Sequence, residues 1–176
     1  MEGVTIETPR FILRSLTEGD ASERYLSWLV DSSVSRFIVS ARPNLRLDDL
    51  RAFIAERLPR RDVLFLGIFL RDGITHIGNI KYEPVNQPKG YAVMGLLIGE
   101  QHWRDKGIAQ EVLKASIDWL AREANIGSVF LGVDRENLSA INAYTKYGFK
   151  LLERDELGIA SERNLAMVYR TGGNRP

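Results

Sequence analysis

The sequence contains no cysteine and only two histidines, His76 and His102. The absence of cysteine excludes disulfides, thiolate metal ligands and a cysteine nucleophile, and it is compatible with a reducing compartment. Because the two histidines fall in separate predicted elements, we expect no metal site. The motifs G-x-G-x-x-G, G-x-x-x-x-G-K-[ST], G-x-S-x-G and H-E-x-x-H are also missing, which excludes the nucleotide, hydrolase and metalloprotease sites that they mark.

An excess of one charge and long apolar runs are missing too. The chain has 24 Lys and Arg against 23 Asp and Glu, so its net charge of +1 gives no reason to expect nucleic acid or a membrane surface as a partner. No apolar run approaches the ~20 residues that cross a bilayer. Residues 1–7 lack the basic start and apolar stretch of a signal peptide. We therefore expect a cytoplasmic protein.

The composition is that of an ordinary globular protein, with 44% apolar and 27% charged residues in a chain of 176. This length is sufficient for one domain with a sizeable core, and we assign it to residues 1–170 with a frayed tail at 171–176. Alternating or continuous apolar runs predict strands over residues 5–16, 63–70, 74–85, 91–98, 128–133, 150–157 and 164–169. Helical spacing predicts helices ending near Val30, over 47–58, up to about Ala124 and over 138–147. The expected class is α/β (α+β).

The most informative stretch follows the apolar run that ends at Ile98. Residues 102–111, His-Trp-Arg-Asp-Lys-Gly-Ile-Ala-Gln-Glu, join that strand to the clearest amphipathic helix of the chain. Backbone N–H groups at a helix start have no partner within the helix, and the helix dipole adds positive charge there. Gly107 permits close approach of the backbone, and Arg104 and Lys106 add full charges. This turn is a candidate pyrophosphate site, although such turns are also common without a ligand.

A second stretch, residues 137–149, reads Asn-Leu-Ser-Ala-Ile-Asn-Ala-Tyr-Thr-Lys-Tyr-Gly-Phe. Asn137 can cap the helix, Tyr144 lies about two turns further on, and Gly148 ends it. Taken alone, this pattern favours a capped structural helix with a half-buried tyrosine.

Together the two stretches resemble a known family. Arg104-x-x-Gly107-x-Ala109 resembles the acetyl-coenzyme A signature of the GCN5-related N-acetyltransferases (GNAT), and the Asn137 to Phe149 pattern resembles their second signature at the expected distance. Segments 8–14, 28–31 and 76–80 resemble the branch of ribosomal-protein alanine N-acetyltransferases. The resemblance covers residues 5 to about 170. It implies the acyl-CoA N-acyltransferase fold, a mixed and mostly antiparallel sheet of about seven strands with about four helices.

The resemblance also implies roles for individual residues. The strand before the motif would splay from its neighbour, and its backbone around Leu97 and Ile98 would pair with the pantetheine arm of acetyl-CoA. The pyrophosphate would be held by the amides of one continuous stretch: Arg104, Asp105, Lys106, Gly107, Ile108, Ala109 and Gln110. Asn137 would orient the cofactor near its thioester, and Lys146 would reach the outer phosphate. Asp105 replaces a common glycine of the family, so its carboxylate must point away from the pyrophosphate.

Catalysis would be direct attack of a primary amine on the thioester. The N–H of Ile98 would polarise the carbonyl, and Tyr144 would protonate the departing thiolate. Glu100 is a candidate general base acting through water, and equally an exposed carboxylate beside a basic turn. Glu83 and His76 are weaker candidates, with structural roles as the alternative. An amine that arrives neutral needs no base, and positioning then does most of the work.

Three acceptors are compatible with these patterns: a protein N-terminus, a small amine and an amino sugar. We expect residues 22–58 and the 86–89 turn to line the acceptor side. Dimers are frequent in the family, so a homodimer is one possible assembly. The alternative reading of function is a non-catalytic acyl-CoA sensor or an interaction protein on the same scaffold.

Overall fold

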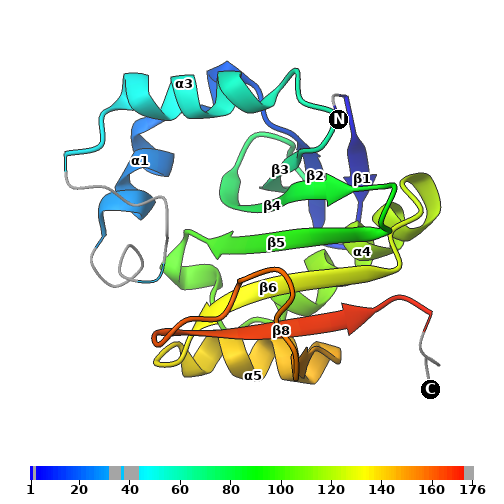
Figure 1. The fold of residues 1–176 in the computed structure, drawn as a ribbon. Helices are drawn as coiled ribbons and strands as arrows, with labels where there is room; N and C mark the ends of the chain where they lie inside the picture. The colour runs from blue at the N-terminus through cyan, green and yellow to red at the C-terminus, as the bar shows by residue number, and fades with distance from the viewer. Residues whose placement is uncertain (2, 32–36, 38–43, 173–176) are drawn as a thin grey trace.

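The sheet at the centre of the computed structural model consists of eight strands, which are mostly antiparallel (Figure 1). The structure describes residues 1, 3–31, 37 and 44–172. The spatial order is β1-β2-β3-β4-β5-β6-β8-β7. The strands are β1 (Thr5–Glu7), β2 (Phe11–Ser15), β3 (Leu64–Leu70), β4 (His76–Asn86), β5 (Tyr91–Ile98), β6 (Ser128–Asp134), β7 (Lys150–Leu151) and β8 (Asn164–Arg170). The eighth strand arises because the 5–16 segment turns at Pro9 and pairs with itself as β1 and β2.

The described ranges contain four α-helices, which lie on both faces of the sheet. They are α1 (Glu23–Val30), α3 (Leu47–Arg57), α4 (Ile108–Glu123) and α5 (Leu138–Tyr147). One apolar cluster lies between the sheet and the inner faces of α4 and α5, and a second lies between the sheet and α1 and α3. Within the described residues no helix is both long and apolar enough to span a membrane.

The helix ends follow the sequence. Asn137 caps α5 by accepting a hydrogen bond from the N–H of Ala140 at 3.2 Å, and Gly148 ends the helix with φ 117°. Gly107 precedes α4 with φ 71°, a left-handed conformation that costs glycine little. Residues 32–36 and 38–43 of the expected acceptor segment lie outside the described residues.

One expectation about the ends of the sheet is wrong. The predicted strand over 150–157 is only two residues long, because residues 152–163 leave the sheet and form a loop organised by the Asp155 carboxylate, which accepts from the N–H of Ala160 at 2.5 Å. The 86–89 turn precedes the start of β5, whereas Ile98 is at its other end. Seven residue steps of extended chain separate Tyr91 from Ile98 by about 24 Å, so this turn does not lie beside Ile98.

Candidate active site

The strands β5 and β6 part in the middle of the sheet. They run parallel and pair from Tyr91 with Ser128 as far as Met94 with Leu131, and no pairing follows. Residues 95–98 of β5 and 132–133 of β6 therefore have no ladder partner in the other strand. Strands that part in this way can accept an extended ligand between them, as in β-strand addition.

The backbone at the open end of β5 alternates in direction. Gly99 donates to the carbonyl of Ile77 at 3.0 Å, so its position is a hydrogen-bonded pair with β4. Ile98, opposite Gly78, is then at a non-hydrogen-bonded position, and its N–H points away from β4. By the same alternation the backbone of Leu97 faces β4. Of these two predicted residues, Ile98 directs its N–H toward the gap and Leu97 does not.

The loop between β5 and α4 presents free amides beside this gap. Among the described residues, none accepts a hydrogen bond from the backbone N–H groups of residues 105–110, and no side chain caps α4. The amide of Arg104 is different, since it donates to the carbonyl of Gln101 at 3.1 Å. The arrangement fits a pyrophosphate at a helix N-terminus, with residues 105–110 rather than 104–110 as the available donors.

The side chain of Arg104 was expected to add its charge to a phosphate site, but it binds backbone carbonyls instead. Its guanidinium donates to the carbonyls of Ile98 at 3.2 Å and Gly99 at 2.9 Å. It therefore fastens the loop to the end of β5 and does not supply its charge freely to a phosphate. Among the residues of the loop, the exposed Lys106 remains for that purpose, with its Nζ 3.1 Å from Nε2 of His102.

Contacts from distant parts of the chain hold the loop in place. Arg10, in the turn between β1 and β2, donates to the Lys106 carbonyl at 2.9 Å and pairs with Glu111 at 2.6 Å. Asp105 has φ 59°, and its carboxylate lies 3.4 Å from the hydroxyl of Ser139 on α5. Gln110 donates to the Ala143 carbonyl at 2.8 Å. Arg10 is part of a segment that resembles the family, but nothing in its local sequence indicated this clamp.

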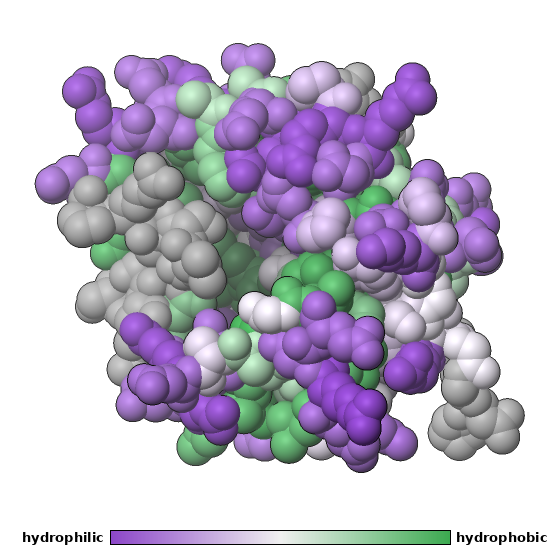
Figure 2. Space-filling model, in the orientation of Figure 1, coloured by the Kyte–Doolittle hydropathy of each residue, from purple (hydrophilic) through white to green (hydrophobic). Residues whose placement is uncertain are grey.

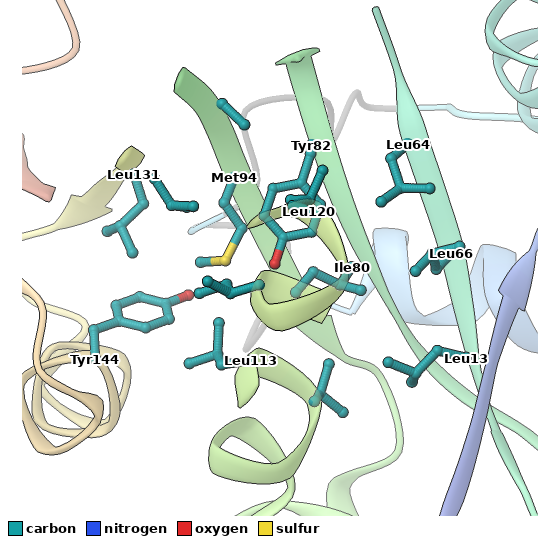
Figure 3. Packing of buried hydrophobic residues seen from close by; sticks show 14 of the residues in the cluster. Leu13, Leu64, Leu66, Ile80, Tyr82, Met94, Leu113, Leu120, Leu131 and Tyr144 are labelled. Carbon is teal, nitrogen blue, oxygen red and sulfur yellow. The ribbon is translucent and has the colours of Figure 1, made fainter. Parts of the chain in front are cut away.

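Tyr144 reaches from α5 to the place where β5 and β6 part (Figure 3). Its ring lies between Met94 of β5, the last residue of that strand to pair with β6, and Leu113 of α4. The side chain is only 7% exposed, and burial raises the pKa of Tyr144 to about 12. The phenol therefore keeps its proton at neutral pH. Asn137, half-buried, and Lys146, exposed, lie at the first and last turns of the same helix.

Comparison with known proteins identifies the family of this chain. The sequence model of the acetyltransferase (GNAT) domain matches residues 10–150, most of the chain. The chain belongs to the GNAT acetyltransferase family. Its fold is similar to that of RimL, a ribosomal L7/L12 α-N-protein acetyltransferase solved with coenzyme A, with a TM-score of 0.80, 12% identity, and 95% and 98% of the two chains covered. The fold is also similar to that of two other solved structures, among further matches.

The first is the ribosomal-protein-S5-alanine acetyltransferase of Vibrio fischeri, with TM-score 0.77, 15% identity and coverage of 98% and 100%. The second is the spermidine N-acetyltransferase of Vibrio cholerae in complex with CoA and spermine, with TM-score 0.76, 18% identity and coverage of 91% and 95%. At these identities the similarity establishes the GNAT fold, not a shared acceptor.

In this GNAT chain Glu100 lies just beyond the open end of β5 and is tied to α1. Its Oε1 accepts from Nε of Arg24 at 2.7 Å and from the indole N–H of Trp28 at 3.1 Å. The hydrogen bond from Arg24 is the main reason why the pKa of Glu100 lies below its usual value. Oε2 has no partner among the described residues. Neither Arg24 nor Trp28 was predicted to act here, because their spacing shows only the apolar face of a helix.

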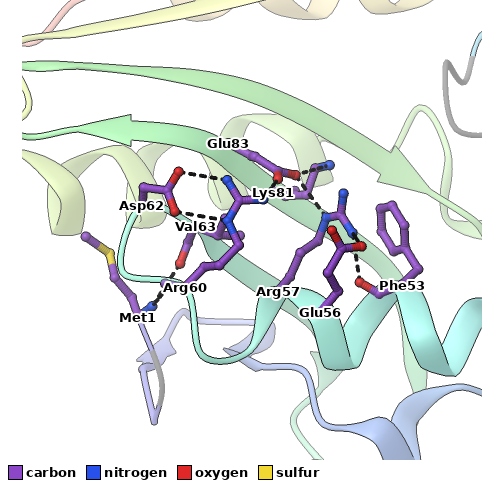
Figure 4. Close-up of polar contacts among 9 residues, drawn as sticks. All are labelled: Met1, Phe53, Glu56, Arg57, Arg60, Asp62, Val63, Lys81 and Glu83. Carbon is purple, nitrogen blue, oxygen red and sulfur yellow. Dashed lines mark hydrogen bonds and ion pairs between the residues drawn. The ribbon is translucent and has the colours of Figure 1, made fainter.

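The two weaker candidate bases have structural roles in this GNAT chain. His76 is 7% exposed and stacks on Phe69, with ring centroids 4.6 Å apart. Its Nε2 lies 2.9 Å from both the Gly78 carbonyl and Oδ1 of Asn79, and burial lowers its pKa. Glu83 lies among the cations of Lys81, Arg57 and Arg60, which come from three different segments (Figure 4).

The ion-pair group around Glu83 gives a prediction about stability. Burial opposes ionisation of Glu83, but hydrogen bonds and charges from Lys81 and Arg57 outweigh it and hold its pKa below the ordinary value of 4.5. We expect Glu83→Gln to lower the free energy of unfolding by about 2 kcal/mol at neutral pH, because it removes a carboxylate that three cations share and leaves Lys81 without an ion-pair partner among the described residues. Urea denaturation measures this difference.

The pH dependence supplies a second readout for Glu83. A carboxylate with a lowered pKa stabilises the folded state above its unfolded pKa and loses that contribution as pH falls through the folded pKa. The difference between wild type and Glu83→Gln should therefore be full above pH ~4.5 and shrink in more acidic solution. Glu56→Gln is the matched control, since Glu56 pairs with Arg57 alone among the described residues and its side chain is 69% exposed. Equal effects of the two substitutions would contradict this account.

Proposed function

We propose that this protein transfers an acetyl group from acetyl-CoA to a primary amine, within the branch related to ribosomal-protein N-acetyltransferases. One observation carries the proposal. The pairing of β5 with β6 stops at Met94, beside the buried Tyr144, and the loop with the free amides of residues 105–110 follows the unpaired end of β5. The backbone there suits a pantetheine arm, the loop suits a pyrophosphate, and the phenol suits a leaving thiolate.

The residues around the gap would hold acetyl-CoA without a metal. The amides of residues 105–110 and the charge of Lys106 bind the pyrophosphate. Asn137 uses its Oδ1 for the helix cap, so its Nδ2 is the group that orients the pantetheine arm. Lys146 binds the outer phosphate. Bound acetyl-CoA supplies the activated acetyl group.

The reaction forms a bond from the amine nitrogen to the acetyl carbon and breaks the bond from that carbon to sulfur. The N–H of Ile98 stabilises the negative charge that develops on the carbonyl oxygen. Tyr144 donates its proton to the sulfur as that bond breaks. An ordinary thiol has a pKa of about 8.5, but burial in apolar surroundings raises it, which brings the sulfur closer to the phenol in proton affinity.

Glu100 is the proposed base. Its Oε2 takes the proton from the amine through a water molecule, while Arg24 and Trp28 fix the other oxygen. The lowered pKa of Glu100 makes it a weak base that is ionised at neutral pH. It therefore serves best for an acceptor amine that is already largely neutral, with positioning as the larger contribution.

Titration with acetyl-CoA by calorimetry tests the cofactor site. The informative variant for this measurement is Asp105→Asn. We expect Asp105→Asn to bind acetyl-CoA several-fold more tightly at low ionic strength, because it removes a like charge next to the pyrophosphate amides. Asparagine tolerates the left-handed conformation at φ 59° and keeps an oxygen for Ser139.

Salt and a remote variant serve as controls for Asp105→Asn. The gain in affinity should shrink as salt is raised, since the site is exposed. Asp48→Asn on α3, whose carboxylate is 78% exposed, should leave the affinity unchanged. No binding of acetyl-CoA at millimolar concentration would refute the cofactor site and leave an interaction protein as the alternative. Binding without transfer to any amine would favour an acyl-CoA sensor.

A further inference from the structure

A cleft of about 600 Å³ opens on the sheet face that is opposite α4 and α5. It lies between the 152–163 loop and strands β6 and β8, toward the start of β5, and so is separate from the candidate active site. On this face, shown in Figures 1 and 2, the loop and β8 lie in front, and apolar and hydrophilic side chains alternate over them. Nothing in the proposed reaction uses this cleft.

Part of the lining of the cleft is apolar. Tyr91 and Phe130 meet edge to face, with ring centroids 5.9 Å apart. Leu151 is 62% exposed and Leu157 is 38% exposed, and both line the same cleft. Single exposed leucines are common on protein surfaces, but two beside an aromatic pair in one concavity are typical of a binding surface.

The cleft is also lined by basic side chains that form no ion pair with another described residue. Its lining includes four exposed basic side chains, Lys89, Lys150, Arg154 and Arg170. None of them forms an ion pair with another described residue, whereas Arg10, Arg14 and Arg24 elsewhere are all paired with carboxylates. Two carboxylates, Glu153 and Glu156, line the cleft as well, so it carries a net positive charge. The four cations come from separate segments, which suits a ligand with several spaced negative charges.

The 152–163 loop, which forms one wall of the cleft, is held in its conformation before any ligand binds. The carboxylate of Asp155 accepts hydrogen bonds from backbone N–H groups of the loop, that of Ile159 foremost, and these bonds lower its pKa. Ile159 lies over Gly132 of β6, where an added Cβ would come within 3.1 Å of its Cγ2. A preformed wall reduces the ordering cost of binding.

Strand β6 runs from the cleft to the candidate active site. Phe130 lies in the cleft and Asp134 ends the strand at the gap, four residue steps or about 13 Å away. An extended peptide spans that distance in about four residues, and it must run beside Ile159, which lies over Gly132 between the two positions. Resting on the proposed function, we infer that the cleft binds an acidic, leucine-containing segment of a protein acceptor whose N-terminal amine enters the active site. A second copy of this chain fits less well, because a two-fold contact would place like cations together.

Fluorescence anisotropy of a synthetic probe tests this inference. The probe is a peptide of alternating Glu and Leu that follow a free N-terminal Ala-Ser, labelled at its C-terminus, and the protein is saturated with CoA. We expect salt-sensitive binding that Arg154→Glu/Arg170→Glu weakens at least about tenfold, since two attractive contacts become repulsive. The same peptide with Gln in place of Glu should bind more weakly to the wild type.

Arg122→Glu on α4 is the matched control for each charge reversal, because Arg122 is also exposed and lies across the sheet. In acetyl transfer, the double variant should raise KM for the acidic peptide and leave kcat unchanged. Its rate with an Ala-Ser dipeptide amide should equal that of the wild type.

Equal effects of the double variant and Arg122→Glu, or no binding of the acidic probe, would overturn the inference. So would a dimer in light scattering that the double variant dissociates. If transfer to the dipeptide amide persists in these cases, the proposed function stands and only the docking surface is lost. Absence of transfer to every amine tested would instead refute the proposed function itself.

Discussion

Replacement of Tyr144 by phenylalanine should lower kcat about 10²-fold or more while leaving the affinity for acetyl-CoA unchanged. The substitution removes one hydroxyl from a side chain that is 7% exposed and retains the ring packing between α5, β5 and α4. The thiolate would then have to leave without a proton donor. Stability should change by less than about 1 kcal/mol, because no packed carbon is removed.

The measurement combines steady-state release of free thiol with acetyl-CoA calorimetry on the same preparations. Tyr169→Phe is the control, since Tyr169 packs against Phe149 at 5.6 Å but lies on β8, outside the proposed site. Because burial raises the pKa of Tyr144 to about 12, its deprotonation should not limit the rate at any pH near neutrality. An unchanged kcat in Tyr144→Phe would remove Tyr144 from the mechanism, and a wild type without turnover would favour the sensor.

The second large effect is expected at Gly78 of β4. A Cβ at this position would overlap the backbone carbonyl oxygen of Leu97 and lie 3.2 Å from Cα of Ile98. Backbone cannot move aside as a flexible side chain can, so Gly78→Ala must push the end of β5 away from β4. We expect a loss of about 3 kcal/mol in the free energy of unfolding.

The same displacement should reduce catalysis, because it moves the Ile98 N–H that the proposed mechanism places at the thioester. A misplacement of about 1 Å can cost roughly 10²-fold in rate, and kcat/KM should fall by this order even where the protein remains folded. Thermal and urea unfolding measure the first effect, and thiol release at low temperature measures the second. Gly95→Ala is the stability control, since a Cβ there meets no heavy atom within 4 Å. A Gly78→Ala protein as stable as the Gly95→Ala protein would show that β5 adjusts without cost.

Much of the fold follows from local patterns in the sequence. The helix over 138–147 begins and ends where Asn137 and Gly148 were expected to cap it, and the helix over 108–123 ends near Ala124 as expected. The strands β3, β4 and β5 lie where strands were predicted. The prediction was wrong for 150–157, where apolar residues indicated a strand. Asp155 gathers the backbone N–H groups that follow it, and this local competition is invisible to hydrophobic periodicity.

The residues of the candidate site were likewise predictable from the sequence only in part. The loop at 104–107 and the pair Asn137 and Tyr144 were singled out because their residue types and spacing are local properties. The positions of Arg104, Glu100 and Glu83 were not predictable, since a charged side chain pairs with whatever the fold places beside it. Arg104 turns back to the carbonyls of β5, and Glu100 meets an arginine 76 residues away. The roles of these side chains depend on contacts that leave no recognisable pattern in the local sequence.

The sequence by itself determined the elements, their caps and the family resemblance, because backbone conformation and amphipathic spacing are set within a few residues. Only the tertiary structure decided which amides point into the gap, since this depends on the register of β5 against β4 and on the loss of pairing with β6 after Met94. It also decided that four unpaired cations and two exposed leucines share one cleft. Lys89 and Arg170 are far apart in the chain, and folding alone brings their charges together.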